Sequence, residues 1–170
     1  MKNVEALSLD PSRTPHEIFR VKSMSIHATG QSYRTINNWD QHGLLENSRI
    51  EKTSWRKFSL MDCVWIKIIS DLRTFGYPLK KLRIVKDNLW KTGKDQESIL
   101  DHLINSYTKL DYNLLLVYPN GDIDLLSCSS KKNLSKLRNH ICISLLEYFD
   151  FFVDNEFQHV YNLKLSDFDK

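Results

Sequence analysis

The sequence has few of the residues that build covalent frameworks, and no stretch that could cross a bilayer. Its 170 residues include only three cysteines, Cys63, Cys128 and Cys142. This odd, widely spaced set gives neither a disulfide framework nor a paired metal-ligand spacing. No apolar run approaches the roughly 20 residues of a membrane span, and the N-terminus lacks the apolar core of a secretory signal. We therefore expect a cytoplasmic protein that does not enter a membrane.

Motifs for catalysis and cofactor binding are also missing. The sequence has no Gly-rich phosphate loop, no zinc-protease motif and no Ser-His-Asp order, and its six histidines are scattered. His140 and Cys142 are two residues apart, which on a helix puts them on different faces. Asp122 and Asp124 alternate along a strand beside a turn, where solvated carboxylates are the ordinary case. These absences predict no enzyme, no cofactor and no metal site.

The two halves of the chain differ in charge. Residues 1–96 hold 17 Lys or Arg against 10 Asp or Glu, a net charge of +7, whereas residues 97–170 hold 7 against 11, a net charge of −4. This asymmetry predicts that the first half meets a polyanion and the second does not, with uneven surface charge as the plainer alternative. The length allows two small domains.

The first half is predicted to begin with a flexible arm followed by two short helices. Residues 1–17 are polar and lack sustained periodicity. Apolar residues at helical spacing from Val21 predict a helix that stops at Gly30. Ser32 is a suitable N-cap for a second helix, which ends near Gly43.

A basic hairpin and two longer helices are expected next. Residues 47–59 are polar and basic with interleaved aromatics, which favours a wing over a helix. Ser59 and Asp62 fit a capping box that opens a third helix, with apolar residues at intervals of three or four up to Gly76. Pro78 fits the first turn of a fourth helix.

Three short motifs follow one another between residues 20 and 90. The pattern TG-x-S-x-x-T-[LI]-R-Y-Y-E-x-x-G-L-L is met by Thr29, Gly30, Ser32, Thr35, Ile36, Trp39, Asp40, Gly43, Leu44 and Leu45. The pattern Y-R-[RK]-[YF]-S-x-x-D is met by Trp55, Arg56, Lys57, Phe58, Ser59 and Asp62. The pattern L-R-x-x-G-[FY]-x-L-x-x-[IL] is met by Leu72, Arg73, Gly76, Tyr77, Leu79 and Leu82. In order and spacing they resemble MerR-type regulators, which implies a winged helix-turn-helix domain at residues 18–91 that binds double-stranded DNA.

The expected DNA-binding residues follow from this resemblance and from what a major groove about 12 Å wide requires. The helix from Ser32 should enter the groove, and the cationic wing should neutralise phosphates. The residues are Gln31, Ser32, Tyr33, Arg34, Asn37, Asn38, Arg49, Lys52, Trp55, Arg56 and Lys57. Asn37 and Asn38 stand where the family has Arg-Tyr, so they either read base edges or are ordinary solvent-facing residues. Trp39 and Phe58 are expected in the core, and Trp55 either packs on the DNA backbone or anchors the wing.

Beyond residue 91 the resemblance stops. Residues 91–94 suggest a linker, and residues 97–170 are predicted to form a small α+β module with a helix over 98–110, a hairpin at Asn120-Gly121 and an apolar helix over 134–152. A helix with so wide an apolar surface predicts a homodimer. The whole chain is therefore expected to be mainly α, with this module serving dimerisation or an unknown effector or protein partner.

Three functions fit these observations. A sequence-specific transcription regulator is favoured. An excisionase-like architectural factor of a mobile element or phage shares the winged fold and bends DNA. A protein-interaction module that has lost DNA binding is suggested by the two asparagines.

Overall fold

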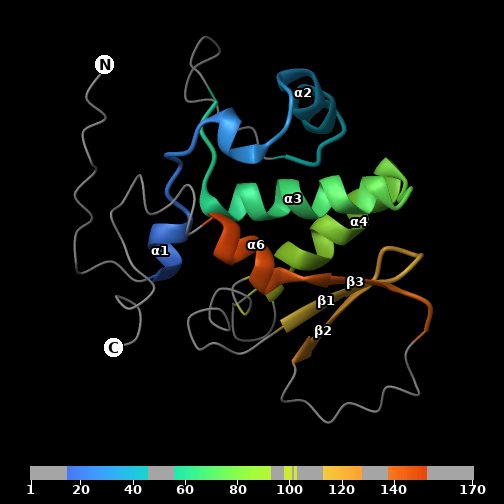
Figure 1. The fold of residues 1–170 in the computed structure, drawn as a ribbon. Helices are drawn as coiled ribbons and strands as arrows, with labels where there is room; N and C mark the ends of the chain where they lie inside the picture. Colours follow the sequence, from blue (N-terminus) through green and yellow to red (C-terminus); the bar gives the residue numbers. More distant parts are fainter. Residues whose placement is uncertain are drawn as a thin grey trace, which may run out of the picture.

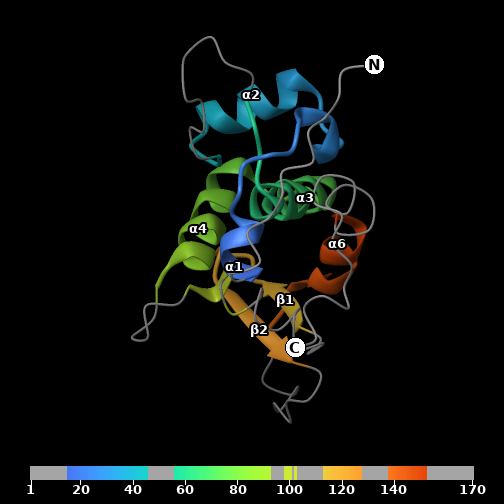
Figure 2. The same ribbon diagram turned by 90° about the vertical axis from the view of Figure 1, so that its left-hand side faces the viewer.

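The computed structural model describes residues 15–45, 56–92, 98–100, 102, 113–127 and 138–152. In chain order the elements are α1 (Pro15–Phe19), η1 (Ile26–Thr29), α2 (Tyr33–Gln41), α3 (Leu60–Thr74), α4 (Leu79–Trp90), β1 (Asn113–Val117), β2 (Ile123–Ser127), β3 (Ile141–Ser144) and α6 (Leu145–Phe152). Figures 1 and 2 show α3 as the central element, with α2 on one side and the sheet on the other.

Helix α3 is central because most of its circumference is apolar. It opens with the expected capping box, in which Ser59 Oγ accepts from the Asp62 N–H and the Asp62 carboxylate accepts from the Ser59 N–H at 2.8 Å. Its buried residues are Leu60, Met61, Cys63, Val64, Trp65, Ile66, Ile68, Ile69 and Leu72. A helix buried on so many sides needs partners all round, and the rest of the chain supplies them.

The start of the chain differs from the prediction. The expected arm ends earlier, because α1 begins at Pro15 and buries Ile18 and Phe19. The segment from Val21 is extended instead of helical: Met24 pairs with Phe58 in an antiparallel bridge, and only η1 is helical. Backbone pairing with residue 58 therefore overrides the helical spacing of the apolar residues.

The second half forms a three-stranded antiparallel sheet in the order β2-β1-β3. The predicted hairpin is confirmed, with Val117 opposite Ile123 and Gly121 at φ +95° in the turn. The predicted helix over 134–152 is wrong in part, since β3 pairs with β1 with Leu115 opposite Ile143, and the helix starts only at Leu145. Residues 134–137 lie outside the described ranges. Of the helix expected over 98–110, Ile99, Leu100 and His102 are helical and the rest is outside the description.

The sheet and α6 pack directly on the helices of the first half. Tyr77 Oη donates to the Tyr118 carbonyl at 2.8 Å, and Asn88 Nδ2 donates to the Gly121 carbonyl at 3.1 Å. The rings of Phe19 and Phe149 lie 6.2 Å apart. Buried residues from α1 through α6 belong to one hydrophobic cluster. The two halves thus share a core across the expected linker, where Thr92 also pairs with Ser98.

Helix α6 turns most of its apolar surface inward. Leu145, Tyr148, Phe149 and Phe152 are buried within this chain, whereas Phe151 is 53% exposed. The apolar area left for a second copy is therefore smaller than the sequence indicated. None of the helices in the described ranges combines the length and the apolar character that crossing a membrane requires.

Candidate nucleic-acid interface

Helix α2 presents one polar face and one buried face. Ser32 caps it, its Oγ accepting from the Thr35 N–H at 3.1 Å as predicted. Ile36 and Trp39 point into the core, and Trp39 is 6% exposed, which confirms its expected core position. The other side is polar: Tyr33 is 52% exposed, Arg34 and Asn38 are exposed, and Asn37 is half-buried. These four side chains and the exposed Gln41 lie on the side of α2 that faces away from the core.

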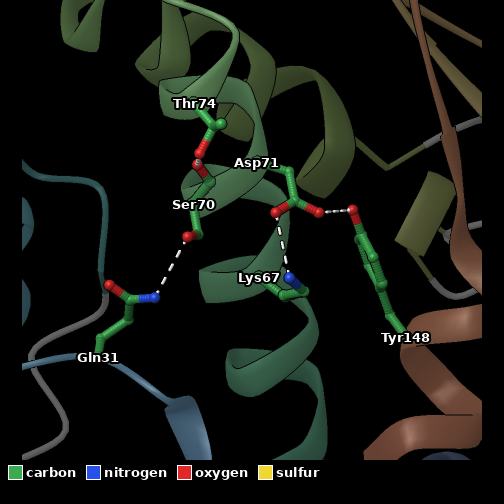
Figure 3. A network of polar contacts seen from close by, with 6 residues as sticks. All are labelled: Gln31, Lys67, Ser70, Asp71, Thr74 and Tyr148. Atoms are coloured by element: carbon green, nitrogen blue, oxygen red, sulfur yellow. Dashed lines mark hydrogen bonds and ion pairs between the residues drawn. The ribbon is translucent and has the colours of Figure 1, made fainter.

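Helix α3 holds α2 and the chain after it in place. Trp65 Nε1 donates to the Leu44 carbonyl at 2.7 Å, and Gln31 Nε2 donates to Ser70 Oγ at 3.2 Å (Figure 3). Gln31 and Ser32, both expected at the DNA, are thus bonded within the protein, one to α3 and one to the first turn of α2. Their geometry gives them a role in fixing the orientation of α2.

Arg56 lies inside the domain, although it was expected to contact phosphate. Its side chain is 3% exposed and its Nη2 is 2.6 Å from Asp40 Oδ2 on α2. Among the described residues its Nε and Nη1 have no hydrogen-bond partner. Residues that alternate along an extended segment point to opposite sides, so Arg56 and Phe58 face inward while Lys57 is exposed. The pair ties the segment that leads into α3 to α2, and it buries the guanidinium that was expected to contact a phosphate.

Three further residues of the expected wing were predicted to contact DNA. Arg49, Lys52 and Trp55 lie outside the described residues, as does most of the segment expected to form the wing. Phe58, near the end of the expected wing, is 2% exposed, which confirms its predicted core position. Its N–H donates to the Met24 carbonyl at 2.9 Å.

Two basic residues of α4 lie beside α2, and the sequence interpretation missed them. Lys86 Nζ donates to the Gly43 carbonyl at 3.1 Å, just after α2 ends. The Arg83 guanidinium lies 3.9 Å from the place that a Cβ on Gly43 would occupy. A spacing of three puts both side chains on one face of a helix, and that spacing was the available signal. They add positive charge at the C-terminal end of α2.

Residues Ser70 and Asp71 of α3 link α2 to the C-terminal helix. Ser70 accepts from Gln31, whereas Asp71 accepts from Tyr148 Oη of α6 and from Lys67 Nζ, the latter at 3.1 Å (Figure 3). Burial raises the pKa of Tyr148, and the bond to Asp71 raises it further. Two neighbouring residues of α3 therefore form polar contacts in opposite directions, one with the residue before the cap of α2 and one with α6. In the described part of the chain no three His, Cys, Asp or Glu side chains gather to hold a metal ion.

Comparison with known proteins identifies this domain. Residues 26–89 match the MerR HTH family of regulatory proteins, a range that contains η1, α2, α3 and nearly all of α4. No curated protein matches the chain. No solved structure matches it either. Over these residues, fewer than half of the chain, the protein is thus similar to the helix-turn-helix domain of MerR-type regulators.

Proposed function

We propose that the chain is a sequence-specific transcription regulator that binds double-stranded DNA with α2 in the major groove. The observation that carries this proposal is the MerR match, because it contains the one helix whose exposed side bears Tyr33, Arg34, Asn37 and Asn38. A helix backed by a core on one side and polar on the other suits a groove that admits a single helix.

The side chains divide into two kinds of contact. Arg34, Lys57, Arg83 and Lys86 are cations suited to phosphates, which fix position but carry no sequence information. Asn38 is an exposed amide on α2, and an amide can bond N6 and N7 of adenine in a bidentate way. In this proposal sequence preference therefore rests on α2, and affinity rests on the basic residues around it.

Homodimerisation through α6 remains a prediction. It is supported by the exposed ring of Phe151 and by the fact that helix-turn-helix proteins commonly bind paired half-sites as dimers. The role of the second half as an effector or partner module likewise remains part of the proposal.

The test measures duplex binding by the full chain across a salt series. Duplexes are first selected from a random pool, and fluorescence anisotropy then compares the selected site with a scrambled one. Arg34→Ala should weaken both duplexes and lower the slope of log affinity against log salt by about 0.9. Asn38→Ala should cost about 1 to 3 kcal/mol on the selected site alone.

A control variant separates local contact from net charge. Glu147→Gln changes an exposed residue of α6 by one charge and should leave the slope unchanged. Inverted repeats in the selected sites favour a regulator, whereas direct repeats favour the excisionase-like factor. Failure of the wild-type chain to bind any duplex in a salt-dependent way would leave only the protein-interaction module.

A further inference from the structure

A cavity of about 560 Å³ lies between the C-terminal end of α4 and the β1–β2 hairpin. Asn88 and Lys91 come from α4 and its cap, and Tyr118, Asp122 and Asp124 come from the hairpin. Arg138, which precedes β3, is the remaining Arg or Lys of the lining, and His102 also lines the cavity. This volume lies within the range of about 300 to 1,000 Å³ typical of small-molecule sites. The cavity shares no residue with the exposed face of α2.

The charges of the lining are balanced. Lys91 and Arg138 are cations, and Asp122 and Asp124 are acids. A polyanion would gain from two of these groups and be repelled by the other two. An apolar ligand would desolvate all four without offering hydrogen bonds, which is unfavourable. The lining therefore favours a small molecule that carries both signs of charge.

Contacts within the chain position two of the four charged groups. Asn120 Nδ2 donates to Asp122 Oδ2 at 2.6 Å, and the Arg138 guanidinium lies over the Tyr118 ring at 5.0 Å. The hairpin itself is fixed to α4 by Asn88 and by Lys81 Nζ, which donates to the Pro119 carbonyl at 2.5 Å. A ligand thus meets Asp122 and Arg138 with contacts that already restrict their side chains, which limits the entropy lost on binding.

Arg138 and Asp122 retain capacity for a ligand. Their closest charged atoms are 4.0 Å apart, and their side chains are 71% and 54% exposed. At this distance the pair is an ion pair without a hydrogen bond, so both groups can form shorter charge-assisted bonds to a ligand.

From these observations we propose that the cavity is a binding site for a small zwitterion, an α-amino acid or a dipeptide. Its carboxylate is bound by Lys91 and Arg138, and its ammonium group by Asp122 and Asp124. Since one wall belongs to α4 and the other to the hairpin, a bound molecule bridges the MerR-type domain and the second half.

The experiment uses the full chain without DNA, so its result is independent of the proposed function. Isothermal titration and thermal unfolding are measured against the twenty amino acids and glycylglycine. Matched analogues that lack one charge, such as propionate and ethylamine beside alanine, serve as discriminators. We expect at least one zwitterion to bind with a dissociation constant between about 1 µM and 1 mM, and its one-charge analogues to bind at least about tenfold more weakly.

Variants assign the binding to this cavity. Lys91→Gln and Arg138→Gln should each weaken binding at least about tenfold, while Lys80→Gln, an exposed lysine of α4 outside the lining, should not. Both cavity positions are exposed, so the midpoint of thermal unfolding without ligand should stay that of the wild type. Absence of binding across the panel, equal binding of the one-charge analogues, or full binding by both cavity variants would each overturn the proposal.

Discussion

At the scale of single residues, the pair between Arg56 and Asp40 joins α2 to the segment that leads into α3. Arg56 is the more deeply buried partner, with 3% of its side chain exposed against 26% for Asp40. Its Nε and Nη1 lack partners among the described residues. A buried charge that loses its counter-ion is strongly destabilising, whereas its replacement by an apolar side chain removes the desolvated groups as well. The two partners should therefore respond differently to substitution.

We predict that Asp40→Asn lowers the free energy of unfolding by about 3 kcal/mol, because it leaves the guanidinium buried and unpaired. Arg56→Met should cost clearly less, since the remaining carboxylate is partly hydrated. Urea denaturation of the full-length variants measures both values. The interpretation fails if Arg56→Met proves as destabilising as Asp40→Asn.

Tyr148 leads to a prediction about alkaline pH. Burial and the bond to Asp71 raise its pKa in the folded chain above the ordinary value of 10.0. Above that pH the unfolded chain releases the phenolic proton while the folded chain keeps it, so stability must fall as pH rises. Below pH 10.0 both the folded and the unfolded chain keep the proton, so the contribution of the Tyr148 hydroxyl to stability is fully present.

The measurement is urea denaturation between pH 8 and pH 11. Tyr148→Phe should be less stable at neutral pH, having lost a bond to a charged group, and its stability should decline less steeply above pH 10. Tyr77→Phe provides a comparison, because burial and Asp122 also raise the pKa of Tyr77, so this variant should change the slope in the same direction. Equal slopes for Tyr148→Phe and the wild type would contradict the prediction.

At the scale of elements, the docking of the hairpin on α4 depends on Gly121. Its φ of +95° is unfavourable for other residues, and a Cβ there would lie 2.8 Å from Ile84 Cβ. Gly76, in the turn between α3 and α4, has a similar φ of +79° but nothing within 4 Å of the same position. Substitution of Gly76 therefore measures backbone strain alone, whereas substitution of Gly121 measures backbone strain together with the collision with Ile84.

We predict that Gly76→Ala costs about 1 kcal/mol, the penalty of the left-handed backbone alone. Gly121→Ala should cost about 1 to 3 kcal/mol more, because the added methyl group also collides with α4. Ile84→Ala in the Gly121→Ala background should recover part of that difference. Urea denaturation of the wild type, the two glycine variants and the double variant provides the comparison. Equal losses of stability for Gly76→Ala and Gly121→Ala would show that Gly121 does not pack closely on α4.

Some elements could be predicted because their signals are local. The capping box of Ser59 and Asp62, the cap of Ser32 and the turn at Gly121 each depend on a few neighbouring residues, and all three are confirmed. Strand β3 could not be predicted in this way. Its apolar residues continue the helical spacing of α6, and only the free edge of β1, a tertiary partner, selects the strand.

The candidate site likewise contains residues whose position follows from local sequence and residues whose position depends on tertiary packing. Phe58 was expected to be buried, and in an extended segment that expectation also places Arg56 inside and Lys57 outside. The family resemblance instead suggested two neighbouring phosphate contacts. Arg83 and Lys86 were missed because their proximity to Gly43 arises from the packing of α4 beside α2, which lies far from them in the sequence.

At the scale of the whole molecule, the net charge changes sign after residue 96, but the hydrophobic core is not divided there. The sequence predicts two small domains joined by a linker at residues 91–94. In the structure, however, α3 and α4 bury apolar residues against α6 and the hairpin, and the cluster includes Leu72, Leu89, Leu115 and Phe149. Removing the second half would expose these faces to water, so we expect the truncated chain to be much less stable than the full chain.

The four tryptophans allow the coupling to be tested without cutting the chain. Trp39, Trp55, Trp65 and Trp90 all precede residue 96, so tryptophan fluorescence reports on the first half alone. Phe149→Ala removes a buried ring of the second half that lies beside Phe19.

If the halves unfold as one unit, Phe149→Ala should lower the free energy of unfolding measured by tryptophan fluorescence in urea by about 3 to 5 kcal/mol. This is the usual cost of deleting a buried ring. Far-ultraviolet circular dichroism should report the same midpoint. Phe151→Ala, a change of the same size at a ring that is 53% exposed, should shift it little. A fluorescence transition that stays at the wild-type midpoint while the dichroism midpoint moves would show that the halves unfold separately, because only then can the first half keep its structure after α6 has lost its packing on α1 and α3.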